Sequence, residues 1–190
     1  MPRMSADEKQ KSHERILKAA SQLFRERGIE TTSVADVMKA AGLTHGGFYR
    51  HFASKEALVA AAFSHAVDEV LSEVEAAPAG PEHAAARDQY VARYLSAEHV
   101  ADRGQGCPLA AMGAEIARLD GAAEAEASDA VVRMARLLAA DERGATDKGV
   151  ATMALLLGTI TLARLAKNQE LADRVLDVGK RGNALIEQRW

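Results

Sequence analysis

The chain is poor in cysteine, proline and aromatic residues, and these shortages narrow the possible protein classes. A single cysteine, Cys107, cannot form an internal disulfide, so we expect a cytoplasmic location. Aromatic residues make up 4% of the chain and there are four prolines. No alternating apolar run bounded by turn residues predicts a β-strand. Alanine and leucine are abundant instead, so the sequence predicts an all-α protein.

Long apolar runs and catalytic signatures are also missing. The longest stretch without a charged residue runs from Gly149 to Ala163. It is shorter than the roughly 20 residues of a membrane-spanning helix and suits a buried helix. The first residues contain no apolar segment, so we expect no secretory signal. There is no glycine-rich phosphate loop, no Gly-x-Ser-x-Gly turn and no metal-ligand spacing of histidines. We therefore expect no enzyme, no bound metal and no cofactor.

Charge is unevenly distributed along the chain. The whole chain has 24 Lys and Arg against 27 Asp and Glu, a net charge of −3. Residues 1–55 carry ten basic and six acidic residues, so the remaining residues carry 14 and 21. A basic N-terminal part on an acidic remainder is typical of a protein that presents one end to DNA phosphates.

Residues 32–42 predict a short capped helix. Ser33 is an N-cap candidate, and Asp36 follows three residues later in capping-box position. Gly42 ends the helix, because glycine adopts the left-handed conformation at little cost. The apolar face of this helix consists of Val34, Val37, Met38 and Ala41.

A second short helix is predicted directly afterwards. Thr44 is placed to cap it, and Phe48 and Phe52 lie four residues apart on its inner face. The outer face is left to His45, Gly46, Tyr49, Arg50 and His51. Two helices joined by a short glycine-containing turn are typical of the DNA-binding helix-turn-helix. The alternative interpretation is that they are two ordinary core helices.

The segment from Thr44 to Leu58 closely resembles the recognition helix and following helix start of TetR/AcrR-type transcriptional regulators. The resemblance is detailed over about residues 10–60 and only architectural beyond them. It implies a three-helix DNA-binding head at 9–55, with the helix-turn-helix at about 32–51 and a connector helix from 54. The remainder, 56–190, is then a larger helical body for effector binding and dimerisation.

Specific DNA contacts follow from the same resemblance. It implies that Thr44, His45, Gly46, Tyr49 and His51 face DNA and that Lys55 reaches a phosphate. Tyr49 also offers a ring to thymine methyl groups, and His45 or Arg50 suits the acceptors of a guanine edge. Thr32 and Ser33 are further candidates for phosphate contacts. His51 packing at the helix end and Arg50 facing solvent remain open alternatives.

The body is predicted to be a series of helices. Their expected ranges are about 54–76, 82–100, 109–119, 121–140, 146–166 and 168–189. Family resemblance implies that the last two pair with those of a second copy in a four-helix bundle, and their apolar surface exceeds one helical stripe. The alternative is that this surface is all core of a single chain. Candidate interface residues are Met153, Leu156, Leu157, Ile160, Leu165, Val175, Val178 and Leu185.

The resemblance also implies a ligand pocket among the body helices. Its effector is expected to be apolar or aromatic, although the same side chains suit an ordinary core. Candidate lining residues are Phe63, Val67, Tyr90, Tyr94, Leu109, Met112, Ile116, Met134, Leu138 and Leu155. Cys107 precedes a predicted helix start, where a thiolate is stabilised. It is a candidate thiol sensor, with a half-buried structural cysteine as the alternative.

These features together predict a sequence-specific DNA-binding transcriptional regulator. The form that we expect is a ligand-responsive repressor acting as a cytoplasmic homodimer on a palindromic operator, because a lone head would bind weakly. An alternative function is a protein-partner platform with a vestigial head. The basic head and the complete cap–turn–cap pattern argue against that alternative.

Overall fold

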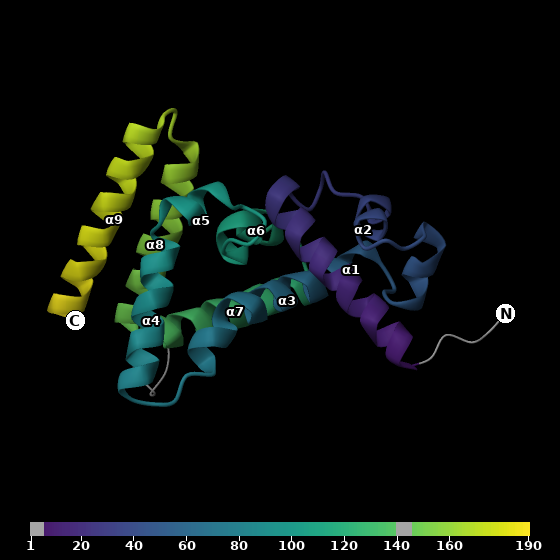
Figure 1. The fold of residues 1–190 in the computed structure, drawn as a ribbon, viewed down its shortest axis with the longest axis horizontal. Helices are drawn as coiled ribbons and strands as arrows, with labels where there is room; N and C mark the ends of the chain where they lie inside the picture. Colours follow the sequence, from purple (N-terminus) through teal and green to yellow (C-terminus); the bar gives the residue numbers. More distant parts are fainter. Residues whose placement is uncertain (1–5, 140–145) are drawn as a thin grey trace.

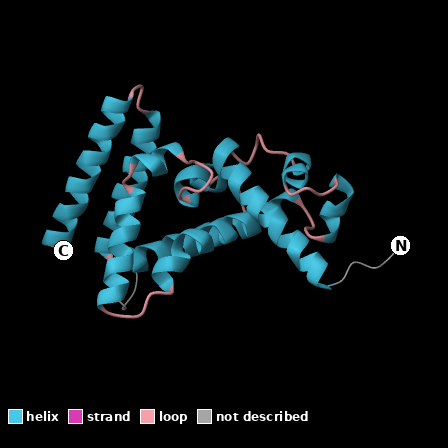
Figure 2. Ribbon diagram, in the orientation of Figure 1, coloured by secondary structure: helices cyan, strands magenta, loops and turns pink. Residues whose placement is uncertain are grey.

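The computed structural model describes residues 6–139 and 146–190. The elements in these two ranges are all helices, and no strand occurs in them (Figure 2). The all-α prediction is therefore confirmed.

The first three elements form a small head around the N-terminal end of the molecule (Figure 1). They are α1 (Ala6–Arg27), α2 (Val34–Ala40) and the 3-10 helix η1 (His45–Arg50). Apolar side chains at helical spacing converge between them because each helix has one apolar stripe. This core consists of Ile16, Ala20, Leu23, Phe24, Val37, Met38, Phe48 and Phe52.

One long helix leads from the head into the body, and a second long helix of the body packs along it. α3 (Lys55–Glu75) and α7 (Ala122–Ala139) pack along each other (Figure 1). Ser54 caps α3 by accepting a hydrogen bond from the backbone N–H of Ala57. The apolar stripe of α3 is buried from Leu58 to Val74, so one continuous helix contributes to the cores of both parts.

The helix predicted over 82–100 is interrupted. The structure has α4 (Pro81–Tyr94) and α5 (Ala97–Ala101) there, because the Ser96 hydroxyl accepts from the His99 backbone N–H and starts a new helix. α6 (Pro108–Ile116) follows, with Pro108 in the first turn, where proline's missing N–H costs no helix hydrogen bond.

The last two helices form an antiparallel hairpin at the end opposite the head (Figure 1). They are α8 (Asp147–Leu165), capped by Thr146, and α9 (Gln169–Arg189), capped by Asn168. The two approach closely where Gly179 faces Thr159. α8 is long and apolar enough to cross a membrane by length and composition alone, but Met153, Leu156 and Ile160 on it are buried in the core.

Candidate nucleic-acid interface

A complete capping box begins α2. The Ser33 hydroxyl accepts from the Asp36 backbone N–H at 3.1 Å, and the Asp36 carboxylate accepts from the Ser33 backbone N–H at 3.0 Å. The Ser33 hydroxyl also donates to the Asp36 carboxylate at 2.5 Å, and this bond together with the one from the Ser33 backbone N–H lowers the pKa of Asp36. The sequence prediction of this helix start is confirmed by the geometry.

The turn after α2 is held by α1. Gly42 has a φ of 68°, in the left-handed region that glycine tolerates. The Arg15 guanidinium donates to the carbonyl oxygen of Ala41 and, at 3.4 Å, to that of Gly42. The Arg15 side chain of α1 therefore holds the turn between the two short helices.

The second helix of the pair is a short 3-10 helix. Phe48 is 1% exposed and stacks on Phe52, which anchors η1 to the head. The Thr44 side chain makes no capping hydrogen bond, contrary to the prediction. The outward residues that the structure brings together on this exposed surface are Thr44, His45, Gly46, Tyr49 and Arg50. Tyr49 is 72% exposed, a large fraction for an aromatic side chain.

Thr32 and Lys55 are not on this surface. The Thr32 hydroxyl is buried and donates to the carbonyl oxygen of Gly28 at 2.7 Å. The Lys55 ammonium donates to the carbonyl oxygen of Ile29 at 2.7 Å, which ties the start of α3 to the link between α1 and α2. Both side chains therefore have internal partners.

His51 lies at the edge of the exposed surface, half-buried against α1. Its ring centroid is 5.8 Å from that of His13, which stacks on Phe52. Burial lowers the pKa of His51, and the neighbouring His13 and Lys9 lower it further. His51 thus packs at the helix end, as the open alternative anticipated.

Two charged side chains connect the head to the body, and no local sequence pattern indicates either contact. The Glu115 carboxylate on α6 accepts from the backbone N–H groups of Ile29 and Glu30. The Arg25 side chain on α1, 1% exposed, donates to the carbonyl oxygen of Gly106 and to the Glu69 carboxylate on α3, each at 3.1 Å. Burial lowers the pKa of Arg25, and Glu69 opposes that shift.

A cavity of 550 Å³ lies beside Arg25. Tyr90 and Tyr94 line it, as the sequence analysis proposed for a ligand pocket. The other candidate lining residues do not border this cavity. Of these, Phe63, Val67, Met112, Ile116, Met134 and Leu138 are buried in the core, and Leu109 packs against it; Leu155 lies against Gly182 on α9.

Cys107 is a buried thiol on the wall of the same cavity. Burial raises its pKa, although Tyr94 and the backbone N–H groups of Leu109 and Ala110 act in the opposite direction. The balance gives a protonated thiol at neutral pH, the less nucleophilic form.

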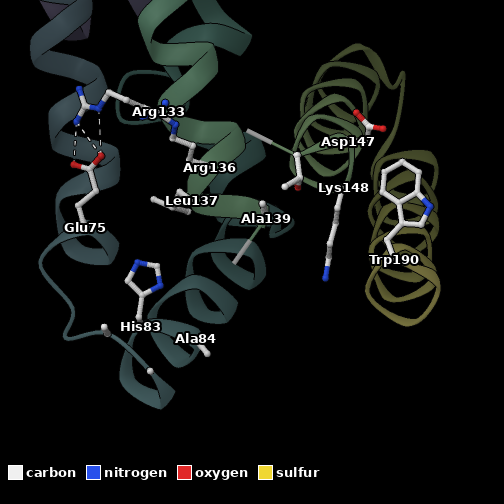
Figure 3. Close-up of a pocket in the computed structure, with 13 residues that line it drawn as sticks. Glu75, His83, Ala84, Arg133, Arg136, Leu137, Ala139, Asp147, Lys148 and Trp190 are labelled. Atoms are coloured by element: carbon white, nitrogen blue, oxygen red, sulfur yellow. Dashed lines mark hydrogen bonds and ion pairs between the residues drawn. The ribbon is translucent and has the colours of Figure 1, made fainter. Parts of the chain in front are cut away.

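A second cavity, of 1410 Å³, lies at the far end of α3 and α7. Figure 3 shows Arg133 bound to Glu75 on one side and Trp190, which follows α9, on the other. Lys148 on its wall pairs with Glu187. The segment 140–145, between α7 and α8, lies outside the described residues, so we assign this cavity no role.

The outer face of the α8–α9 hairpin is apolar and uncovered in the single chain. Of the candidate interface residues, Leu165, Val178 and Leu185 are exposed, whereas Met153, Leu156 and Ile160 belong to the core of this chain. Leu157 and Val175 are half-buried. Leu162 and Leu171 on the same two helices are exposed as well.

Comparison with known sequences matches only part of the chain. Residues 16–62 match the family model described as bacterial regulatory proteins, tetR family. The HTH-type transcriptional regulator YvdT of Bacillus subtilis is 35% identical over 63 residues, 33% of this chain and 32% of its own length. TtgR of Pseudomonas putida is 39% identical over 61 residues, 32% of this chain and 29% of its own length. The match therefore spans about a third of these curated relatives.

Comparison with solved structures extends over almost the whole chain. A TetR transcriptional regulator from Chloroflexus aurantiacus superposes with a TM-score of 0.72 at 23% identity, covering 94% of this chain and 96% of that one. NemR of E. coli in its reduced form gives a TM-score of 0.67 at 22% identity, covering 90% and 95%. At these identities the likeness shows a shared fold.

Proposed function

The N-terminal domain of this chain belongs to the TetR family of bacterial regulatory proteins, and from that premise we propose that the whole chain is a cytoplasmic, ligand-responsive repressor that binds operator DNA as a homodimer. The observation that carries the proposal is the exposed surface of η1. The family match covers only part of the chain. For the other parts, the proposal is argued from the chemistry of their own residues.

The η1 surface has the chemistry of a DNA reader. Tyr49, His45 and Arg50 project from a helix whose other side is anchored by buried Phe48. Their donors and ring suit base edges and phosphates in the major groove. A Cβ at Gly46 would meet nothing within 4 Å, so packing inside the chain does not require glycine there. A close approach of the DNA to the backbone gives a reason for it.

A dimer would place two such surfaces on one duplex. The exposed apolar face of the α8–α9 hairpin supports self-association, because a monomer gains nothing from leaving it in water. Two-fold symmetry then matches a palindromic operator whose half-sites lie about 34 Å apart.

The contacts of Arg25 and Glu115 support a response to ligand. Arg25 binds Gly106 in the segment that forms part of the wall of the 550 Å³ cavity. Glu115 binds the head from α6, the helix that follows this segment. An effector that favours one arrangement of these segments would shift the spacing of the two heads and lower DNA affinity by its differential binding energy. We expect repression to be relieved in this way.

The test is binding of the purified protein to DNA upstream of its own gene at two salt concentrations. We expect specific binding that weakens with salt, and a Tyr49→Ala variant that folds normally but loses it. Trp190→Ala, an equally exposed aromatic side chain at the other end, is the matched control. If genomic selection recovers no binding site, the regulator proposal is wrong and a partner platform becomes the better interpretation.

A further inference from the structure

The 550 Å³ cavity has an aromatic floor with unused hydrogen-bonding capacity. Tyr90 is 4% exposed and Tyr94 is 3% exposed, and both line the cavity. The Tyr90 hydroxyl has no hydrogen-bond partner among the described residues, whereas the Tyr94 hydroxyl faces the Cys107 thiol. A buried, unpaired hydroxyl loses the hydrogen bonds that it makes with water in the unfolded chain, so native proteins seldom leave one without a partner. A ligand with a hydrogen-bond acceptor would supply the missing partner.

The charged side chains that line the cavity have an excess of carboxylates. The acidic ones are Glu69, Glu73, Glu98 and Asp102, and the basic ones are Arg25 and Arg93. Arg25 is paired with Glu69 at 3.1 Å and Arg93 with Glu73 at 2.9 Å. Two further guanidinium groups, those of Arg103 and Arg164, do not line the cavity, and Arg164 donates to the carbonyl oxygen of His99. The lining therefore carries two more negative than positive charges.

We propose that this cavity binds a flat organic cation that also carries a hydrogen-bond acceptor. Aromatic rings attract organic cations through their negative faces, and carboxylates around the opening add to the attraction. The inference rests on the proposed function in one respect: it names the chemical class of the effector. The presence of the site itself does not depend on DNA binding.

Glu69 connects the cavity to the head. Its carboxylate is one-third exposed and pairs with Arg25 of α1, and the imidazole Nε2 of His65 on α3 lies 3.6 Å from it. A cation at the cavity would compete with Arg25 for this carboxylate. Arg25 also holds the Gly106 carbonyl, so the segment 102–107 and the end of α1 would loosen together.

The experiment compares two fluorescent probes that differ in charge, without DNA present. The cation is 6-methoxy-1-methylquinolinium and its neutral counterpart is 6-methoxyquinoline, at a pH where the latter is unprotonated. We expect the cation to bind the full-length protein about tenfold more tightly, with an affinity that falls as salt rises. Glu69→Gln should remove most of this preference. Glu82→Gln, an acidic residue on α4 outside the cavity, is the matched control.

Tyr90→Phe provides a second variant with little risk to the fold, because it removes only an unpartnered hydroxyl. It should weaken both probes by about fivefold, since each carries the methoxy acceptor. Equal affinity for the two probes, or binding of neither, overturns the inference and leaves the DNA-binding proposal standing. Cation binding in a protein that binds no DNA would instead keep the site and reject the regulator.

Discussion

The Glu115 carboxylate accepts a hydrogen bond from the backbone N–H of Ile29 at 3.0 Å, although the two residues are 86 positions apart in the chain. Glu30 donates to the same oxygen at 3.1 Å. The link follows Gly28, whose φ of 92° turns the chain so that both N–H groups face α6. One side chain of the body thus satisfies two backbone donors of the head.

Replacing Glu115 by alanine should destabilise the protein by about 1–3 kcal/mol, because it leaves these N–H groups without a charged acceptor. Chemical denaturation measures the loss. Asp129→Ala, an exposed acidic residue on α7, should change stability by less than about 0.5 kcal/mol. Equal effects of the two substitutions would show that the Glu115 contact contributes nothing specific.

Gly149 is where α7 and α8 approach most closely. A Cβ at this position would lie 1.9 Å from the carbonyl oxygen of Ala135, so the backbone of one helix would have to move. We expect Gly149→Ala to lower stability by about 1–3 kcal/mol. Gly113→Ala within α6, where a Cβ meets nothing within 4 Å, should be neutral or stabilising by up to about 1 kcal/mol. Thermal unfolding of both variants measures these two changes in stability.

Sequence reasoning succeeded where structure follows from local chemistry. Ser33, Gly42 and Thr146 lie at the helix ends that their capping preferences indicate. It failed where a side chain's partner is distant. Nothing near Glu115 in the chain indicates that it binds residues 29 and 30, and nothing about Thr32 indicates that its hydroxyl turns inward to Gly28.

The candidate pocket shows the same limit. An apolar side chain at helical spacing suits a core and a cavity equally, so Met112 and Tyr90 looked alike in the sequence. The difference between them depends on how α1, α3, α4 and α5 cross, which no local pattern specifies.

Charge placed on the uncovered face of the hairpin should prevent self-association. Leu162 is 59% exposed and Val178 is 52% exposed, so a Leu162→Arg, Val178→Asp double variant loses little packing within one chain. We expect a monomer with near-normal helix content, seen by sedimentation. Val132→Asp, on an exposed face of α7, is the control and should retain the wild-type mass. If the double variant still dimerises, the interface lies on another surface of the chain.

Acid should destabilise the protein through His99. Burial lowers the pKa of His99 below its ordinary value, although its hydrogen bond to the carbonyl oxygen of Tyr94 acts in the opposite direction. Below about pH 6.5 the unfolded chain binds a proton at His99 more readily than the folded chain does. The free energy of unfolding therefore falls as the pH falls below about 6.5. Protonation also removes the Nε2 acceptor of the Cys107 backbone N–H.

Thermal unfolding at pH values above and below about 6.5 measures this loss of stability. A His99→Gln variant should be less stable at neutral pH but should depend less on pH. His45→Gln, at an exposed position, should keep the wild-type pH dependence. A His99→Gln variant with the full wild-type dependence would assign it to another group.

Cys107 should react slowly with iodoacetamide in the native protein at neutral pH. Its thiol is 2% exposed and burial raises its pKa, so little thiolate is present or reachable. Mass spectrometry after timed quenching gives the rate, and the unfolded protein gives the reference. Native alkylation as fast as in the unfolded chain would revive the thiol-sensor hypothesis.

Because α3 is one uninterrupted helix, a tilt at its body end moves its head end. Its 21 residues span about 30 Å, with one end in the head and the other beside Arg133 of α7. A tilt of roughly 5° about the far end would displace the near end by roughly 3 Å over that length. A displacement of that size equals a full hydrogen-bond length. A rearrangement of the body by fractions of an ångström at the far end of α3 is therefore enough to disengage a side chain such as Tyr49 from a base.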